Sequence, residues 1–279
     1  MRLDWPASWR TRNYRKTRRR AEPECADPVM FARDRLGFDP DARQEAVLRA
    51  RTKRGLLNCT RQWGKSTVTA AKAVHRAWTA PGSLVLVVSR AQRQSGEFVR
   101  KAAEFVRRLG VRARGDGDNE ISLLLPNGSR IVGIPGMEAT VRGFSAVNLL
   151  LIDEAAKVPD ELYDAVTPMI AVGGGDLWLM STPNGRRGFF WEEWARGGDM
   201  WMRVSVPATE CPRIPEWFLA EERRRKTERV FRQEYMCEFA DTEAAVFSED
   251  SIQRALCWDI KPLEVPPFEP RQRREWRER

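Results

Sequence analysis

The chain has 279 residues, 42% of them hydrophobic, which is enough for one large domain or two small ones with a sizeable core. No stretch approaches the roughly 18 apolar residues of a membrane span, and the basic N-terminus lacks an apolar signal-peptide core, so we expect a cytoplasmic protein without a membrane partner. The five scattered cysteines and single histidine do not predict a zinc cluster, so carboxylates, lysine and arginine must supply any chemistry.

The net charge of +9 is concentrated at the two ends of the chain. Residues 10–20 carry seven positive charges and no negative one, and residues 271–279 carry five positive and two negative. The rest of the chain is therefore nearly neutral. Basic runs of this kind are either solvated tails or DNA contacts, and the composition does not decide between the two.

Two short helices are predicted first, followed by a strand and a helix. Residues 27–37 form a helical pattern with a glycine stop, and residues 39–53 form another that Asp39 or Asp41 caps. Gly55–Cys59 is a short apolar strand and Lys65–Trp78 a helix.

The middle of the chain continues the alternation of strands and helices. Ser83–Ser89 (SLVLVVS) is wholly apolar, as strands of a parallel sheet buried on both faces are. A helix over residues 92–109 follows, and then two short strands, Ile121–Leu125 and Arg130–Ile134, which flank PNGS as a β-hairpin.

The second half contains three more predicted strands and three helices. The strands are Asn148–Asp153, Asp176–Thr182 and Trp201–Val206; one helix covers residues 160–171, and two helices rich in arginine and glutamate follow the last strand. Strands alternating with helices predict an α/β domain with a mainly parallel sheet. Ligands of such sheets bind at the carboxyl ends of the strands.

A candidate phosphate-binding loop follows the first strand. Cys59–Thr67 (CTRQWGKST) contains the second half of the pattern GxxxxGK[ST], with Cys59 in place of its first glycine. Gly64 allows backbone N–H groups to point at phosphate oxygens, Lys65 is placed to bridge the β- and γ-phosphates, and Ser66 offers its hydroxyl to magnesium. The alternative is an ordinary solvated turn before a helix.

Two acids end the strand over residues 148–153. Asp153 is placed to hold magnesium at the strand tip, and Glu154 to orient and deprotonate a water molecule. The alternative is that the pair only caps the following helix. A lysine of a phosphate loop together with this acid pair indicates phosphoryl transfer.

These segments together resemble the large terminases of tailed phages. The resemblance rests on the loop Cys59–Thr67, on Ile134–Tyr163 around the acids, on Trp178–Gly185 (WLMSTPNG) and on Gln233–Ile252. It covers about residues 27–258. It implies a P-loop NTPase of the ASCE type, a mainly parallel sheet sandwiched by helices, in which one strand is inserted between the strands of the two nucleotide motifs. SLVLVVS is our candidate for that inserted strand.

The resemblance also assigns roles to residues. It implies that ATP and Mg²⁺ bind, with Asp153 and Ser66 as metal contacts and Glu154 as the catalytic base. It places Arg61 at the γ-phosphate of its own subunit, acting in catalysis. The nucleotide contacts that it implies in the loop are Arg61, Gln62, Gly64, Lys65, Ser66 and Thr67.

Four more positions match the family's pattern. Gln44 is similar to a residue that hydrogen-bonds adenine; the alternative is a surface glutamine. Ser181 and Thr182 match a coupling motif that senses the γ-phosphate; the alternative is a strand-end turn. Arg142 matches an arginine inserted into a neighbouring subunit's site, where it takes part in catalysis; the alternative is an exposed loop arginine.

The predicted organisation is a basic tail (1–26), an ATPase domain (27–240) and a linker remnant with an Arg-rich tail (241–279). Large terminases continue with a nuclease domain, and so few residues follow Ile252 that we expect no nuclease activity from this chain.

The implied function is an ATP-driven motor that packages double-stranded DNA into a procapsid. Its implied partners are DNA, a portal protein, a small terminase subunit and further copies of the chain in a ring. The alternatives are a nucleotide-binding protein without turnover and another P-loop enzyme, such as a helicase or a kinase.

Overall fold

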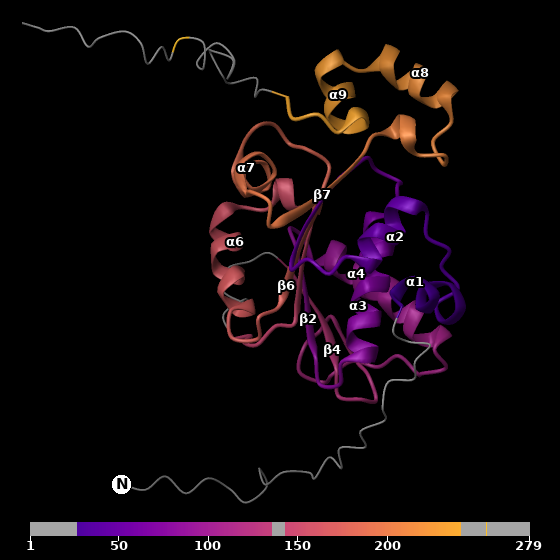
Figure 1. Ribbon diagram of the computed structural model, residues 1–279, viewed down its shortest axis with the longest axis vertical. Coiled ribbons are helices and arrows are strands. Elements are labelled where there is room, and N and C mark those ends of the chain that lie inside the picture. The colour runs from indigo at the N-terminus through magenta and orange to yellow at the C-terminus, as the bar shows by residue number, and fades with distance from the viewer. Residues whose placement is uncertain (1–26, 136–142, 241–254, 256–279) are drawn as a thin grey trace, which may run out of the picture. The chain divides into compact units, whose positions relative to one another are not determined.

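The structure of the chain is a computed structural model that describes residues 27–135, 143–240 and Ala255. Seven strands form one sheet between two helical layers (Figure 1). The strands are β1 (Arg54–Cys59), β2 (Leu84–Ser89), β3 (Ser122–Leu124), β4 (Arg130–Pro135), β5 (Leu149–Asp153), β6 (Asp176–Ser181) and β7 (Trp201–Val206). The α-helices are α1 (Pro28–Met30), α2 (Ala42–Arg49), α3 (Lys65–Thr79), α4 (Gln92–Arg108), α6 (Asp160–Val166), α7 (Gly188–Arg196), α8 (Glu216–Arg225) and α9 (Glu228–Met236).

The sheet order is β3-β4-β2-β5-β6-β1-β7, and every neighbouring pair is parallel except β3 with β4. The predicted α/β class and the antiparallel hairpin around PNGS are confirmed. The prediction for the inserted strand is wrong, because β2, which contains SLVLVVS, lies on the far side of β5. The strand between β1 and β5 is β6, which follows both nucleotide motifs in the sequence.

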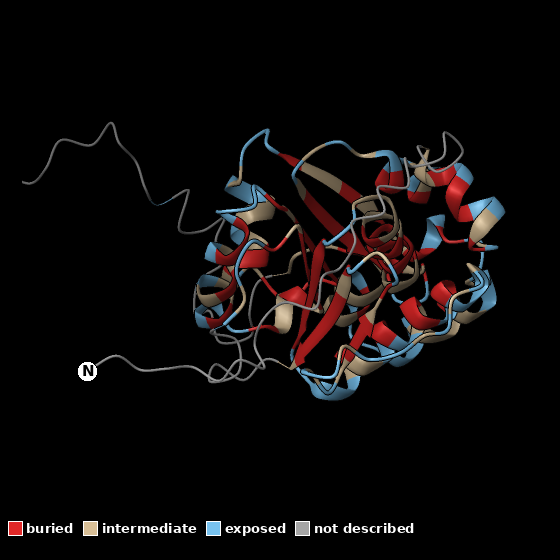
Figure 2. Ribbon diagram, turned by 90° about the horizontal axis from the view of Figure 1, so that it is seen from below, coloured by how far each residue is buried: buried red, intermediate tan, exposed pale blue. Residues whose placement is uncertain are grey.

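Each face of the sheet covers its own hydrophobic core. Alternate residues of β1 show this, because Leu57 packs with α3 and α4 in one core whereas Leu56 packs with α6 and α7 in the other. The central strands are buried on both faces (Figure 2). This double burial explains why their sequences are continuous apolar runs rather than alternating patterns.

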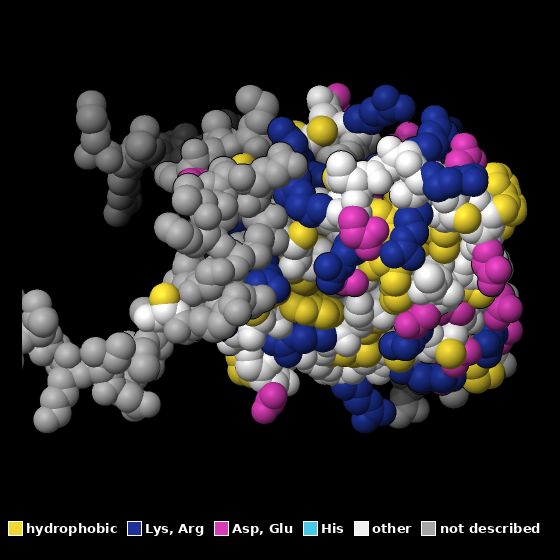
Figure 3. Space-filling view, turned by 90° about the horizontal axis from the view of Figure 1, so that it is seen from above, with side chains coloured by type: hydrophobic (Ala, Val, Ile, Leu, Met, Phe, Trp, Pro, Cys, Tyr) yellow, Lys and Arg dark blue, Asp and Glu magenta, His cyan; other side chains and the backbone are white. Residues whose placement is uncertain are grey.

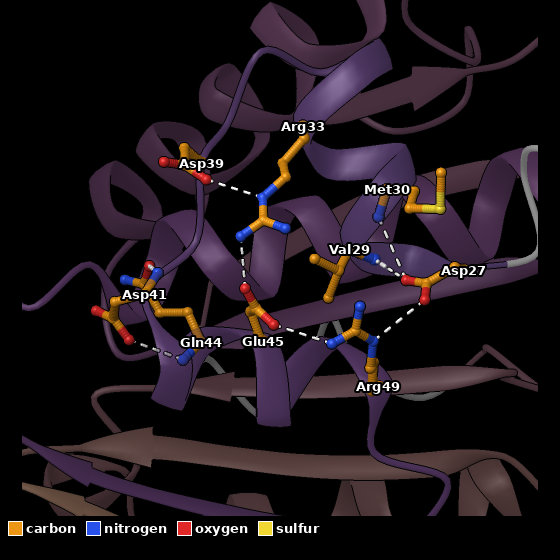
Figure 4. Close-up of polar contacts among 9 residues, drawn as sticks. All are labelled: Asp27, Val29, Met30, Arg33, Asp39, Asp41, Gln44, Glu45 and Arg49. Atoms are coloured by element: carbon orange, nitrogen blue, oxygen red, sulfur yellow. Dashed lines mark hydrogen bonds and ion pairs between the residues drawn. The ribbon is translucent and has the colours of Figure 1, made fainter.

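Polar contacts join the N-terminal helices and show which residue caps the N-terminus of α2 (Figure 4). Asp41, not Asp39, is the N-cap; its carboxylate accepts from the Gln44 N–H at 2.9 Å, and the Gln44 side chain accepts from the Asp41 N–H at 3.0 Å. This is a capping box. Asp39 instead pairs with Arg33, which also pairs with Glu45 of α2.

Three predicted helices differ from the structure in extent. Only Pro28–Met30 is α-helical in the first, and a π-helical segment, Phe31–Arg35, continues it to just before Gly37. The second, α2, ends at Arg49, because Ala50 has an extended backbone. The helix predicted over residues 160–171 is α6 followed by a 3₁₀ helix, Thr167–Ile170; Pro168 has no N–H to continue an α-helix. In the described part of the chain, no helix is long and apolar enough to cross a membrane.

Candidate nucleotide-binding site

The candidate site lies at the carboxyl edge of β1, β5 and β6. Lys65 opens α3 directly after the loop that follows β1, Asp153 ends β5, and Ser181 ends β6. Because β6 pairs with both β1 and β5 in parallel, the three strand ends lie on the same edge of the sheet. The structure therefore brings the two acids, the lysine and the coupling residues to one edge.

Lys65 is buried, with only 8% of its surface exposed, and its ammonium group points back at the loop. Nζ donates to the carbonyl oxygens of Cys59 at 2.6 Å and Thr60 at 3.0 Å. Burial lowers the pKa of Lys65, and the charges of Glu154 and Asp153 partly offset that effect. An ammonium group has three donors, so one remains for a phosphate oxygen in this orientation.

Ser66 and Asp153 contact each other across the gap between α3 and β5. The Oγ of Ser66 lies 3.4 Å from Oδ2 of Asp153. Burial, followed by the neighbouring Glu154 charge, raises the pKa of Asp153 to about 6. A hydroxyl and a carboxylate at this separation provide the hard oxygen ligands that Mg²⁺ prefers, so this pair fits the predicted metal site.

Glu154 occupies a left-handed backbone conformation, with φ of 54°. Its N–H donates to Oδ1 of Asp153 at 3.0 Å, and its carboxylate pairs with Lys157 at 3.1 Å. A left-handed non-glycine residue costs on the order of 1–3 kcal/mol, and such residues cluster at functional sites. The strained turn directs the two adjacent acids differently: Asp153 toward Ser66 and Glu154 toward Lys157.

Side chains from segments distant in the sequence hydrogen-bond to the phosphate loop. Gln62 and Gly64 have φ of 70° and 97°. The carbonyl of Trp63, between them, accepts from Nε2 of Gln44 and from Arg213, each at 2.9 Å. Gln44 is therefore buried rather than on the surface, and its amide is bonded to the loop and to the α2 cap.

Cys59, which stands in place of the first glycine of the usual loop pattern, belongs to the strand β1. It is the last residue of β1, it is fully buried, and its Sγ lies 3.7 Å from the Val204 carbonyl oxygen. Burial raises the pKa of its thiol. Cys59 is thus a core side chain.

Arg61 forms an ion pair with a residue of α9. Its Nε pairs with Glu234 of α9 at 2.9 Å, and its side chain is 61% exposed. Together with Gln62 and Arg213 it lines a pocket of about 600 Å³, whose other wall contains Phe218 of α8 and Tyr235 of α9. This pocket places aromatic and charged side chains beside the loop.

The coupling residues are buried and their hydroxyls are unsatisfied. Ser181 and Thr182 are 0% and 1% exposed, and neither hydroxyl has a hydrogen-bond partner among the described residues. Thr67, at the other side of the site, is half-buried and its N–H donates to the Gly64 carbonyl. Arg142 lies outside the described residues.

A second cavity, of about 250 Å³, lies in front of the two acids. Ser66, Asp153 and Glu154 form one wall. The other wall is α4, which contributes Arg93, Gln94, Glu97, Phe98 and Lys101. Sequence reasoning gave no site role to the α4 residues, Trp63, Arg213 or Lys157. Trp63 lies inside the loop Cys59–Thr67 and Lys157 three residues after Glu154, but neither is a fixed position of the motif. Arg213 and the α4 residues reach the site from segments whose proximity is recognisable only once the strands are ordered.

Comparison with known families identifies the chain. The sequence model described as "Terminase large subunit, T4likevirus-type, N-terminal" matches residues 56–254, which include the loop, the acids and the coupling residues. The chain belongs to this family. Its described part is therefore the N-terminal, ATPase domain of a terminase large subunit, and it has the α/β fold of a solved large terminase ATPase domain.

Terminases of known sequence and structure are similar to most of the chain. The "Terminase, large subunit" of Thermus phage G20c and that of Thermus virus P23-45 are each 26% identical over 253 residues, which covers 76% of this chain and 51% of theirs. The chain spans about half the length of these relatives.

Two solved structures have the same fold. The large terminase ATPase domain of Thermus phage P74-26 matches with a TM-score of 0.67 at 23% identity, covering 75% of this chain and 97% of that one. The large terminase of a thermophilic bacteriophage, solved in complex with ATP-gamma-S, matches with a TM-score of 0.58 at 14% identity, covering 71% of this chain and 52% of that one.

Proposed function

We propose that this terminase domain hydrolyses ATP with Mg²⁺ and that the energy drives double-stranded DNA into a procapsid. The observation that carries the proposal is the contact of Ser66 with Asp153, which joins the phosphate loop to the acid strand. Membership of the terminase family supports the coupling to DNA packaging. DNA cleavage is not part of the proposal.

The proposed roles follow from the position of each side chain. Ser66 and Asp153 hold Mg²⁺, which when bound neutralises charge on the phosphates. Lys65 and the N-terminus of α3 bind phosphate oxygens. Glu154 orients the attacking water and accepts its proton. Arg61 must leave Glu234 before it reaches the γ-phosphate, so binding of ATP competes with that ion pair.

The nucleotide contacts of Gln62, Gly64 and Thr67 are proposed on the same basis. Gln44 is proposed at adenine, although its side chain is buried and does not line the 600 Å³ pocket; the aromatic wall of that pocket is proposed to meet the base. Ser181 and Thr182 are proposed to sense the γ-phosphate, which would satisfy buried hydroxyls that have no partner among the described residues. Arg142 is proposed to act on the site of a neighbouring subunit.

The proposed partners are double-stranded DNA, a portal protein, a small terminase subunit and further copies of the chain, in the cytoplasm of the bacterial host. Membership of the terminase family supports these partners, whereas the surface charge gives them little further support. On the face seen in Figure 3, lysine and arginine side chains alternate with acids and apolar groups. DNA contact is therefore argued from the motor role rather than from a uniform basic surface.

The deciding experiment is ATP hydrolysis by the purified protein with Mg²⁺, with and without linear duplex DNA. Glu154→Gln should bind ATP but lose about 10²–10⁴-fold in turnover, because an amide cannot accept the proton. Lys65→Ala should weaken binding as well. Glu161→Gln, an exposed position on α6, is the matched control and should hydrolyse ATP like the wild type.

The same experiment tests the alternative of nucleotide binding without turnover. Hydrolysis that is equal in wild type and Glu154→Gln, or absent from both while ATP still binds, would contradict the proposed reaction.

A further inference from the structure

The four residues that end the described domain, 237–240, are attached to the nucleotide-binding edge at two points; we call them the exit segment. At its start, Nδ2 of Asn58 donates to the Cys237 carbonyl oxygen at 2.7 Å, and the Sγ of Cys237 donates to the Val206 carbonyl at 3.3 Å. Both contacts are buried. Asn58 is the last residue but one of β1, directly before the candidate phosphate loop Cys59–Thr67.

At its other end, the exit segment is attached to the turn that follows the coupling residues. The Arg186 N–H donates to the Ala240 carbonyl at 3.2 Å, and its Nε donates to the Phe239 carbonyl at 3.2 Å. The Phe239 ring packs against the aromatic side chains of α7, with ring centroids 4.8 Å from Trp191 and 5.8 Å from Trp194. The exit segment therefore bridges the end of β1 and the β6–α7 connection.

Asn58 also lies beside the coupling motif within the sheet. Asn58 and Ser181 are paired positions on the neighbouring parallel strands β1 and β6, and both side chains lie on the α7 face. Asn58 is 1% exposed and Ser181 0%. Oδ1 of Asn58 and Oγ of Ser181 both lack a hydrogen-bond partner in the described part of the chain.

At these paired positions Ser181 offers a donor and Asn58 an acceptor, and neither atom has another partner among the described residues. A buried group without a partner costs about 1–3 kcal/mol, so native proteins rarely keep one without a reason. The Ser181 hydroxyl has a single proton to donate, and Oδ1 of Asn58 is an acceptor. That proton cannot serve the γ-phosphate and Asn58 at the same time.

We propose that Asn58 is a positioning residue that relays the state of Ser181 to the exit segment. The inference rests on the proposed role of Ser181 as a γ-phosphate sensor. When the γ-phosphate is present, the Ser181 hydroxyl donates to it; when it is absent, the hydroxyl donates to Oδ1 of Asn58. Because the amide group is planar, a turn that brings Oδ1 to Ser181 also moves Nδ2, and with it the bond to Cys237.

Hydrogen exchange of two backbone amides measures the relay directly. The Arg186 N–H is bonded to the Ala240 carbonyl and the Glu238 N–H to the Arg232 carbonyl, so their exchange reports how firmly the exit segment is held. In wild type, saturating ATP-gamma-S with Mg²⁺ should change the hydrogen-exchange rate of both amides by about tenfold, which corresponds to ~1.4 kcal/mol.

Two variants interrupt the relay at different points. Asn58→Leu removes both amide contacts, and Ser181→Ala removes only the hydroxyl and leaves the Asn58–Cys237 bond intact. Measured at a concentration of ATP-gamma-S that saturates each variant, both should lose the nucleotide-dependent change at Arg186 and Glu238. The matched control is Asn127→Leu. Like Asn58, Asn127 donates from its side-chain amide to backbone carbonyls, in this case those of Ala77 and Trp78, which lie far from the exit segment. This variant should keep the change.

The outcomes separate the inference from the function on which it rests. A wild-type protein that binds ATP-gamma-S without a change at either amide would overturn the relay and leave the ATPase proposal intact. A Ser181→Ala protein that keeps the full change would also overturn it, even if Asn58→Leu does not fold. Failure of the wild type to bind the nucleotide would refute the proposed function, and the relay with it.

Discussion

The carboxylate of Asp153 lies at the buried end of β5, next to Glu154. Because of this environment, its protonation state depends on pH near neutrality. Burial and the charge of Glu154 raise its pKa to about 6. A raised carboxylate pKa means that the proton is held more tightly than in the unfolded chain, so the charged form that a metal needs is lost as pH falls through about 6. Mg²⁺ must displace that proton.

We therefore expect Mg²⁺-dependent ATP binding to be about tenfold weaker at pH 5 than at pH 7.5. Calorimetric titration at the two pH values, with and without Mg²⁺, measures the difference. Asp153→Asn is the control, since it should bind with little dependence on either Mg²⁺ or pH. A pH dependence that persists unchanged in Asp153→Asn would assign the effect to another group.

Gln44 has a structural role in this protein besides its proposed contact with adenine. It completes the α2 capping box with Asp41 and supports the phosphate loop through the Trp63 carbonyl. We expect Gln44→Ala and Asp41→Ala each to lower the free energy of unfolding by about 1 kcal/mol, since both remove the capping box. Denaturant unfolding measures this.

The two variants differ in what they should do to base preference. Only Gln44→Ala should lose the preference for ATP over GTP, because Asp41→Ala leaves the amide in place. Competition binding of the two nucleotides tests the difference. An unchanged preference in Gln44→Ala would limit this residue to capping α2 and supporting the loop.

At the scale of the elements, the ring of Trp178 on β6 fills the space beside its paired residue on β1, Gly55, so this position tolerates no side chain. A Cβ added to Gly55 would lie 2.3 Å from Cε3 of Trp178, whose ring is fully buried. We expect Gly55→Ala to destabilise the domain by about 1–3 kcal/mol through overpacking. Gly96→Ala in α4 is the control: no atom lies within 4 Å of its added Cβ, so a helix former there should stabilise by about 0.5–1 kcal/mol. Equal melting temperatures for the two variants would contradict the packing argument.

The elements themselves were largely readable from the sequence, whereas their order in the sheet was not. Apolar runs such as NLLLID and DLWLMS mark strands because both faces of these strands are buried. The same burial makes the runs interchangeable, so nothing local distinguishes β2 from β6 as the neighbour of β1. Helix ends were predicted less well where backbone chemistry decides them, as at Pro168 and Ala50.

The candidate site, too, could be predicted from the sequence only in part. Lys65, Ser66, Asp153 and Glu154 are adjacent to strand ends, so a sequence pattern combined with the rule for parallel sheets places them together. The hydrogen bond from Arg213 to Trp63 joins residues 150 positions apart, and no sequence pattern predicts it. Partnerships such as that of Glu154 with Lys157 depend on a left-handed backbone, which sequence does not predict for glutamate.

At the scale of the assembled motor, we expect Arg142 to complete the site of a neighbouring copy. Its guanidinium group can stabilise charge on a phosphoryl group in transfer, an effect worth about 10³–10⁵ in rate in well-studied cases. Arg142→Ala should therefore bind ATP normally and hydrolyse it poorly even when assembled. Mixing it with Glu154→Gln should restore part of the activity, because some interfaces combine an intact arginine with an intact glutamate. ATP hydrolysis of the mixtures at fixed total protein measures this, and mixed assemblies as inactive as either parent would assign Arg142 a role outside the neighbouring site.

The position of β1 in the sheet has a consequence for how the chain is made. β1 is the first strand to leave the ribosome, yet its two neighbours, β6 and β7, begin only at Asp176 and Trp201, more than a hundred residues later. Until those residues emerge, the strand that carries the phosphate loop has two unpaired edges, while β2, β4 and β5 can already pair with one another. Loop closure over such a separation is slow, and unpaired apolar edges aggregate. The strand that carries the candidate nucleotide-binding loop is thus completed late in synthesis, and its unpaired edges need protection by chaperones until β6 and β7 emerge.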